Sequence, residues 1–166
     1  MKQPLWTPSE EKIKSSNMFK YLQYAESFSG RKFADYPDLY QWSVSDIEKF
    51  WESIWNVADI KYSENYEKVL ENAVMPGAKW FEGSKLNFAE NLLRYRDNKT
   101  AIICSREKAP TIRLTYSELF ELVAKCSFSL RELGIGEGDR VAGFVSNIPE
   151  SIIAMLSAAS IGAVWS

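Results

Sequence analysis

Apolar side chains recur every three or four residues near the start of the chain, which is the spacing of one face of a helix. The first such stretch begins at Ser15 or Ser16 as N-cap and ends near Phe28, and Gly30 follows as a stop signal. The pattern predicts a helix. Its buried face is predicted to consist of Met18, Phe19, Leu22, Ala25 and Phe28.

A second amphipathic stretch follows a turn. Residues 35–38 (DYPD) suit a turn or a single helical turn that carries residues 39–42. Ser45 and Glu48 then have the spacing of a capping box. They precede a broad apolar stripe made of Ile47, Phe50, Trp51, Ile54 and Trp55. No polar anchor interrupts this stripe, so we interpret it as core rather than as a ligand platform.

Weaker signals lie between residues 62 and 97. Residues 62–70 are predicted to form another short helix, and residues 75–78 (MPGA) a loop. Asn87 and Glu90 again have capping-box spacing and are predicted to open a helix. Residues 80–81 (WF) are predicted to be buried as an anchor against the neighbouring α/β segment.

The second half of the chain alternates strand and helix signals. Residues 100–105 and 110–114 are predicted to pair as a hairpin across a charged turn. Thr115 and Glu118 form a further capping-box pattern, and apolar residues at helical spacing continue to Leu133.

A β-α-β pattern closes the chain. Residues 141–146 are predicted as a strand, Asn147 with Glu150 as the capping box of a helix, and Gly162 as its stop. A second strand is predicted from residue 163, parallel to the first. The chain stops on this strand, so we expect it to be the front piece of a longer, incomplete α/β domain.

The aromatic residues divide the chain. Eighteen of the 23 aromatics precede Thr100. The fold class is therefore predicted as α/β, with an aromatic-rich helical segment over residues 1–97 and the start of an α/β domain over residues 98–166.

Composition and charge exclude several functions. The chain is 46% hydrophobic with a net charge of −2, which provides no basic field for nucleic acid. It contains no histidine, and Cys104 and Cys126 lie far apart, so neither a zinc site nor a disulfide framework is predicted. The amino terminus lacks the apolar core of a signal peptide, and residues 152–165 are too short to span a bilayer. We expect a cytoplasmic protein without a membrane partner.

The residues that could carry chemistry are few. Without histidine there is no Ser-His or Cys-His pair, and no phosphate-binding P-loop is present. Residues 134–138 (GIGEG) are rich in glycine, but they follow a helix and precede a strand, which reverses the order of a dinucleotide fingerprint. We interpret them as a helix stop and a turn.

Several motifs resemble the amino-terminal part of acetoacetyl-CoA synthetases, in order and spacing, over essentially the whole chain. Early examples are LWTPS at residues 5–9, SNM at 16–18, FADY at 33–36, LYQWSV at 39–44 and FW at 50–51. Later examples are MPGAKWF at residues 75–81, LNFAENLLR at 86–94, GDRV at 138–141 and AMLSAASIGAVWS at 154–166.

The resemblance implies the first part of an adenylate-forming ligase. In that family a carboxylate, here acetoacetate, reacts with ATP and Mg²⁺ to give an acyl-adenylate, and CoA then displaces AMP. The family's phosphate loop, ribose-binding Asp and adenylation Lys lie downstream of the matched region. No catalytic, cofactor-binding or metal-binding residue is therefore assigned to this chain, and the chain alone is expected to be inactive.

Two alternatives remain open. The chain could be part of another short-chain ligase, such as an acetyl- or propionyl-CoA synthetase, because the residues that select the acyl group are absent here. It could also be a non-enzymatic helical interaction module, which would be expected to end in polar, exposed residues.

Overall fold

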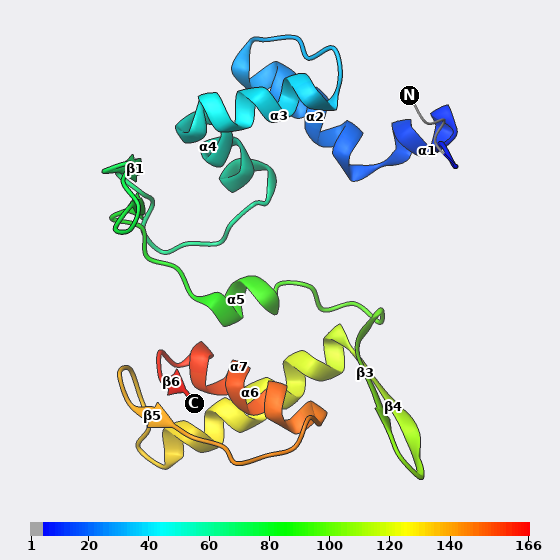
Figure 1. The fold of residues 1–166 in the computed structure, drawn as a ribbon. Helices are drawn as coiled ribbons and strands as arrows, with labels where there is room; N and C mark the ends of the chain where they lie inside the picture. The colour runs from blue at the N-terminus through cyan, green and yellow to red at the C-terminus, as the bar shows by residue number, and fades with distance from the viewer. Residues whose placement is uncertain (1–4) are drawn as a thin grey trace. The chain divides into compact units, whose positions relative to one another are not determined.

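A computed structural model describes residues 5–166, which form two compact units (Figure 1). The first unit contains the chain up to Ile60 together with Asn65–Ser84, and the second contains Lys61–Glu64 and Lys85–Ser166. The chain therefore passes from one unit to the other three times, the last time between Ser84 and Lys85. The domain boundary at residue 97 rests on aromatic content and stays a prediction.

Four helices make up most of the first unit: α1 (Glu10–Ser15), α2 (Asn17–Ser29), α3 (Tyr36–Ser45) and α4 (Ile47–Val57). The Ser16 hydroxyl accepts a hydrogen bond from the Phe19 N–H and caps α2. Gly30 ends α2 in the left-handed conformation. The predicted N-cap and the predicted stop signal of this helix are both confirmed. α3 is ten residues long and capped by Asp35, so the single turn predicted there is too short.

The predicted capping box at Ser45 and Glu48 is wrong. Ser45 is the last residue of α3, and its hydroxyl donates to the Trp42 carbonyl. Asp46 is the N-cap of α4 and makes no side-chain capping bond. Only this one residue separates the helices, and its N–H still bonds to the Trp42 carbonyl. Ser45 therefore lies within a helix instead of at the extended position that a capping serine needs.

A hairpin replaces the helix predicted over residues 62–70. Strands β1 (Lys68–Glu71) and β2 (Lys79–Glu82) pair antiparallel, with Leu70 opposite Trp80. Val69 and Leu70 are buried. The strand depends on partner residues that lie 8 to 14 positions further along the chain, so the local pattern could not reveal it.

Aromatic rings form much of the core of the first unit. The buried cluster consists of Ala25, Phe33, Leu39 and Trp42, with Phe50 packed against it. Trp55 of α4 is also buried, as the core interpretation of this stripe predicted, whereas Trp51 is 41% exposed.

The anchor predicted at residues 80–81 is placed differently from the prediction. Trp80 is 42% exposed and contacts the Trp51 ring edge-on, at 5.7 Å between ring centroids. Phe81 packs against Trp55 at 4.6 Å and against Tyr66 at 5.4 Å. The prediction of two rings buried against the α/β segment is wrong, because the ring partners belong to the first unit itself.

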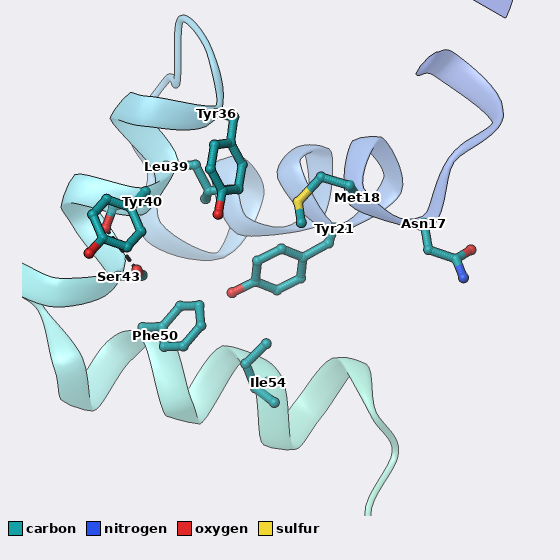
Figure 2. A pocket seen from close by; sticks show the side chains of 9 residues that line it. All are labelled: Asn17, Met18, Tyr21, Tyr36, Leu39, Tyr40, Ser43, Phe50 and Ile54. Carbon is teal, nitrogen blue, oxygen red and sulfur yellow. Dashed lines mark hydrogen bonds between the residues drawn. The ribbon is translucent and has the colours of Figure 1, made fainter. Parts of the chain in front are cut away.

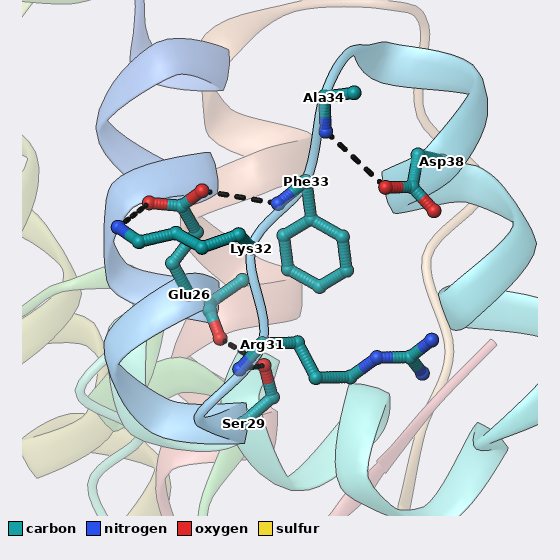
Figure 3. A network of polar contacts seen from close by, with 8 residues as sticks. Glu26, Ser29, Arg31, Lys32, Phe33, Ala34 and Asp38 are labelled. Carbon is teal, nitrogen blue, oxygen red and sulfur yellow. Dashed lines mark hydrogen bonds and ion pairs between the residues drawn. The ribbon is translucent and has the colours of Figure 1, made fainter.

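A polar clasp holds the connection between α2 and α3 (Figure 3). The Glu26 carboxylate accepts hydrogen bonds from the Lys32 ammonium at 2.8 Å and from the Phe33 N–H at 3.0 Å. The Ala34 N–H donates to Asp38 at 3.2 Å. The bonds to Lys32 and then Phe33 lower the pKa of Glu26. Only 17% of the Glu26 side chain is exposed, but 89% of the Lys32 side chain is, so this ion pair lies at the surface.

Acid is expected to weaken this clasp. Because the pKa of Glu26 is lower in the folded state, the charged carboxylate stabilises the protein above its unfolded pKa of about 4.3, and the stabilisation is lost as pH falls through the folded value. In urea titrations, Glu26→Gln should be less stable than the parent chain at pH 7, and the difference should shrink below about pH 4. Glu11→Gln, for which the described residues show no ion pair, is the matched control. A difference that stays constant with pH would contradict the role of Glu26.

The second unit begins with α5 (Phe88–Leu92) and the antiparallel hairpin of β3 (Thr100–Arg106) and β4 (Ala109–Thr115). α6 (Tyr116–Glu132), β5 (Arg140–Val141), α7 (Pro149–Ser160) and β6 (Val164–Trp165) follow. The hairpin, the Thr115–Glu118 capping box and the parallel pairing of β5 with β6 confirm the predictions. The core contains Ala89, Leu93, Leu119, Val123 and Leu156.

Two details around β5 differ from the prediction. The strand covers only Arg140–Val141 instead of residues 141–146. α7 begins at Pro149 with Ile148 as an N-cap that makes no side-chain bond, so the Asn147–Glu150 capping box does not form. The first turn is held instead by Ser151, whose hydroxyl donates to the Ile148 carbonyl at 2.6 Å.

Candidate functional site

The candidate site lies at the carboxyl ends of β5 and β6, which are joined through α7. Arg140 is opposite Val164, and Val141 is opposite Trp165. The pairing continues past the strand ends, since the Gly143 N–H donates to the Ser166 carbonyl at 2.9 Å. In open α/β sheets, ligands bind outside the carboxyl ends of parallel strands. Residues 142–147 and 165–166 therefore form the edge where a ligand site is expected.

The Trp165 ring lies directly on the backbone of Gly143. A Cβ atom added at Gly143 would stand 2.5 Å from the ring, closer than real Cβ contacts allow. Only glycine fits this position without moving the indole. Sequence analysis did not identify this contact, although an isolated glycine in a strand pattern is a known signal of close approach. The contact gives the site edge one fixed aromatic wall.

The glycine-rich turn before β5 uses its polar groups within the protein. Gly134 adopts a positive φ just after α6. The Gly136 N–H donates to the Asp139 carboxylate at 2.9 Å, and the Gly138 N–H donates to the Gly162 carbonyl at 3.0 Å. These bonds confirm the interpretation as a helix stop and a turn.

Two side chains hold α7, the helix that connects β5 and β6, in place through hydrogen bonds. The Ser157 hydroxyl is fully buried and donates to the Ile153 carbonyl at 2.6 Å and, more weakly, to the Val123 carbonyl of α6 at 3.2 Å. Asn87 acts at two helix ends. Its Oδ1 accepts from the Glu90 N–H at 3.1 Å and caps α5, as predicted, while its Nδ2 donates to the Ala159 carbonyl at 2.9 Å.

Removing this double cap should have a measurable cost. Asn87→Ala deletes a helix N-cap and removes one of the two groups that donate to the Ala159 carbonyl at the end of α7, so we expect the free energy of unfolding to fall by about 1–2 kcal/mol. Urea denaturation monitored by circular dichroism measures it. The matched control is Asn98→Ala, an exposed asparagine, with an expected change within about 0.5 kcal/mol. Equal effects at both positions would show that Asn87 does not join the two helices.

The described residues contain few groups for chemistry. Among residues 5–166, no group of three or more His, Cys, Asp or Glu side chains could hold a metal ion. Cys104 is buried and Cys126 half-buried, both as free thiols. None of the helices in this part of the chain is long and apolar enough to cross a membrane. The expectation that the chain contains no catalytic or cofactor-binding residue stays a prediction.

Two protein families match successive parts of the chain. Residues 36–92 match the acetyl-coenzyme A synthetase N-terminus, and residues 88–166 match the AMP-binding enzymes. The second match covers α6, α7 and the β5–β6 pair, which contains the candidate site.

Relatives and a solved structure narrow the family. Acetoacetyl-coenzyme A synthetase of Rhizobium meliloti (strain 1021) is 39% identical over 163 residues, which cover 98% of this chain and 25% of that protein. The structure of acetoacetyl-CoA synthetase from Streptomyces lividans superposes with a TM-score of 0.89 at 35% identity, over 99% of this chain and 26% of that one. This chain matches the amino-terminal portion of acetoacetyl-CoA synthetases. The resemblance inferred from the motifs and the predicted α/β class are thereby confirmed.

The similarity extends beyond acetoacetyl-CoA synthetases. Malonamoyl-CoA synthetase of Penicillium aethiopicum is 36% identical over 169 residues, covering 97% of this chain and 23% of that protein. The chain thus spans about a quarter of the length of the curated relatives it matches.

Proposed function

We propose that this chain forms the amino-terminal part of an ATP-dependent acetoacetate–CoA ligase. The observation that carries the proposal is the alignment with acetoacetyl-CoA synthetases over 98% of the chain. The two family matches follow one another along the chain, which supports a helical front followed by the start of an AMP-binding domain. A free-standing interaction module has no comparable support.

The reaction would join acetoacetate to CoA in two steps. The acetoacetate carboxylate attacks the α-phosphate of ATP, which forms acetoacetyl-adenylate and releases pyrophosphate. The CoA thiol then attacks the acyl carbon and displaces AMP. Such chemistry depends on positioning and on neutralising phosphate charge. We place it in the cytoplasm, as the sequence predicts.

The described residues do not fit the groups that this chemistry needs. They offer no cluster of carboxylates for Mg²⁺ and no glycine-rich phosphate cradle, because four of the five N–H groups of the turn at residues 134–138 bond within the protein. We therefore assign no chemical step and no ligand contact to a side chain of this segment.

The role of this segment is to build part of the scaffold. α7 is fixed by Asn87 and Ser157, and it connects the two parallel strands in the order that an α/β ligand site requires. The Trp165 ring on Gly143 shapes the edge where these strands end. The chain would thus contribute one aromatic side of the site and part of the sheet beneath it. The reactive groups would come from other parts of the ligase.

The identity of the acyl group is the more specific part of the proposal. A malonamoyl-CoA synthetase is nearly as similar over this region as the acetoacetyl-CoA synthetases, so these residues alone do not select the substrate. A ligase for another short acid is the second candidate, and the malonamoyl relative is the observation that favours it.

Pyrophosphate exchange into ATP separates the two candidates. In a form of this protein with the full length of its relatives, exchange should depend on acetoacetate. Acetate and malonamate should give kcat/KM values lower by roughly 10- to 200-fold, the range that small differences in a pocket provide. A preference for acetate or malonamate would overturn the acetoacetate assignment, and absence of exchange with all three would overturn the ligase proposal.

A further inference from the structure

Gly143 differs from the other glycines of the chain in why a side chain is excluded. Six of the eight glycines, all of which lie in the described residues, have a positive φ, a backbone conformation that itself favours glycine. Gly136 and Gly143 do not, so their backbones would accept alanine. An added Cβ at Gly136 meets nothing within 4 Å, whereas at Gly143 it meets the Trp165 ring. The glycine at position 143 is therefore matched to the indole and not to its own backbone.

The clash at Gly143 involves one half of the indole. The three atoms nearest to an added Cβ are Cη2 at 2.5 Å, Cζ2 at 3.0 Å and Cζ3 at 3.5 Å, and all three belong to the six-membered ring. Carbon atoms pack best at about 3.5–4.0 Å, so the ring would have to move by roughly 1 Å. An imidazole at position 165 would lack the clashing atoms.

Hydrogen bonds on both sides of this contact hold the backbone in place, where β6 lies beside β5 (Figure 1). The Ser166 N–H donates to the Val141 carbonyl at 2.9 Å, and the Gly143 N–H donates to the Ser166 carbonyl at 2.9 Å. The two strands cannot shift past one another without breaking these bonds. A forced movement would therefore displace the Trp165 indole, or residues 144–147 that follow Gly143, from the site edge.

We propose that Gly143 and Trp165 form a matched pair of positioning residues for the ligase reaction, an inference that rests on the proposed function. The pair holds residues 144–147 and Ser166, which leave the carboxyl ends of the two parallel strands. Ligands of α/β proteins bind at such an edge. Neither residue takes part in a chemical step. A displacement of about 1 Å in a site can lower a rate by about 100-fold, because the reacting groups lose their alignment.

The test uses a form of this protein with the full length of its relatives, and the acid that the pyrophosphate exchange assay selects. The kcat/KM for formation of the CoA thioester from that acid, ATP and CoA covers both half-reactions. Gly143→Ala should lower this kcat/KM by about 10- to 100-fold. Trp165→His removes the six-membered ring without adding a clash, and it should lower kcat/KM by about tenfold at about pH 8, where imidazole is neutral.

The double variant separates a matched pair from two independent residues. Because Trp165→His removes the clashing atoms, adding Gly143→Ala to it should lower kcat/KM by less than about threefold further. A general effect of replacing glycine would not be rescued in this way. The matched control is Gly136→Ala, whose Cβ meets no neighbour, and it should change kcat/KM by less than about twofold.

The outcomes distinguish this inference from the proposed function. Losses that multiply in the double variant, or a parental kcat/KM in Trp165→His, would overturn the positioning role alone. A parent form that makes no CoA thioester from acetoacetate, acetate or malonamate would overturn the ligase proposal, and the positioning role with it. Circular dichroism at the assay temperature shows which variants are folded. If Gly143→Ala is not, Trp165→His decides, because it adds no atom to the contact.

Discussion

Truncating Trp42 to alanine is expected to destabilise the first unit by about 3–5 kcal/mol, the usual cost of removing a large buried ring. Trp42 is 1% exposed. Its ring contacts Phe33 at 5.4 Å and Phe50 at 6.0 Å, and these partners come from the α2–α3 connection and from α4. The cavity would therefore open where three helices meet. A urea titration followed by circular dichroism measures the loss.

Two further variants distinguish the contribution of the buried ring from that of its indole N–H. Trp51→Ala removes a ring of the same kind that is 41% exposed, so its cost should be clearly smaller. Trp42→Phe keeps an aromatic ring and removes an indole N–H that is buried without a hydrogen-bond partner among the described residues. Its cost should lie well below that of Trp42→Ala. Equal losses for Trp42→Ala and Trp51→Ala would mean that Trp42 is not the centre of this core.

The elements that could be predicted from the sequence are those specified within a few residues. Ser16 and Gly30 mark the ends of α2, and Thr115 with Glu118 forms a complete capping box at α6. Each signal acts through a hydrogen bond or a backbone conformation that involves only neighbouring residues. The alternation of strand and helix after residue 98 likewise predicted the parallel β5–β6 pair.

The predictions that were wrong share a different physical cause. Ser45 and Glu48 have the spacing of a capping box, but α3 continues through Ser45 because Trp42 and Leu39 are buried in the core. Val69 and Leu70 form a strand because residues 79–82 pair with them. In these cases packing or pairing outside the local stretch overrides local preference.

The candidate site could be predicted only in part. The β-α-β pattern places the carboxyl ends of two strands at one edge, which follows from the sequence. The contact between Gly143 and Trp165 does not, because it depends on the register of the two strands. The glycine alone could have indicated a close approach, but not its partner. The apolar pocket lined by residues of α2, α3 and α4 likewise depends on how these helices pack (Figure 2).

The central proposal is that this chain is scaffold from an acetoacetate–CoA ligase and contains no complete active site. Its largest expected effect is on activity. Most N–H groups of the turn at residues 134–138 bond internally, and no metal-binding cluster is found among residues 5–166, so we expect no contact with the phosphates of ATP from these residues. Without that contact the adenylation step, in which the carboxylate attacks the α-phosphate, loses its main source of rate acceleration.

The most direct measurement compares acetoacetate-dependent exchange of pyrophosphate into ATP in two proteins. One is residues 1–166 alone. The other is a chimera in which these residues replace the matching quarter of the Streptomyces lividans acetoacetyl-CoA synthetase, which has the same fold over this region. We expect no exchange above background from the chain alone and acetoacetate-dependent exchange from the chimera. Exchange catalysed by residues 1–166 alone, or a chimera that is folded but inactive, would contradict the account.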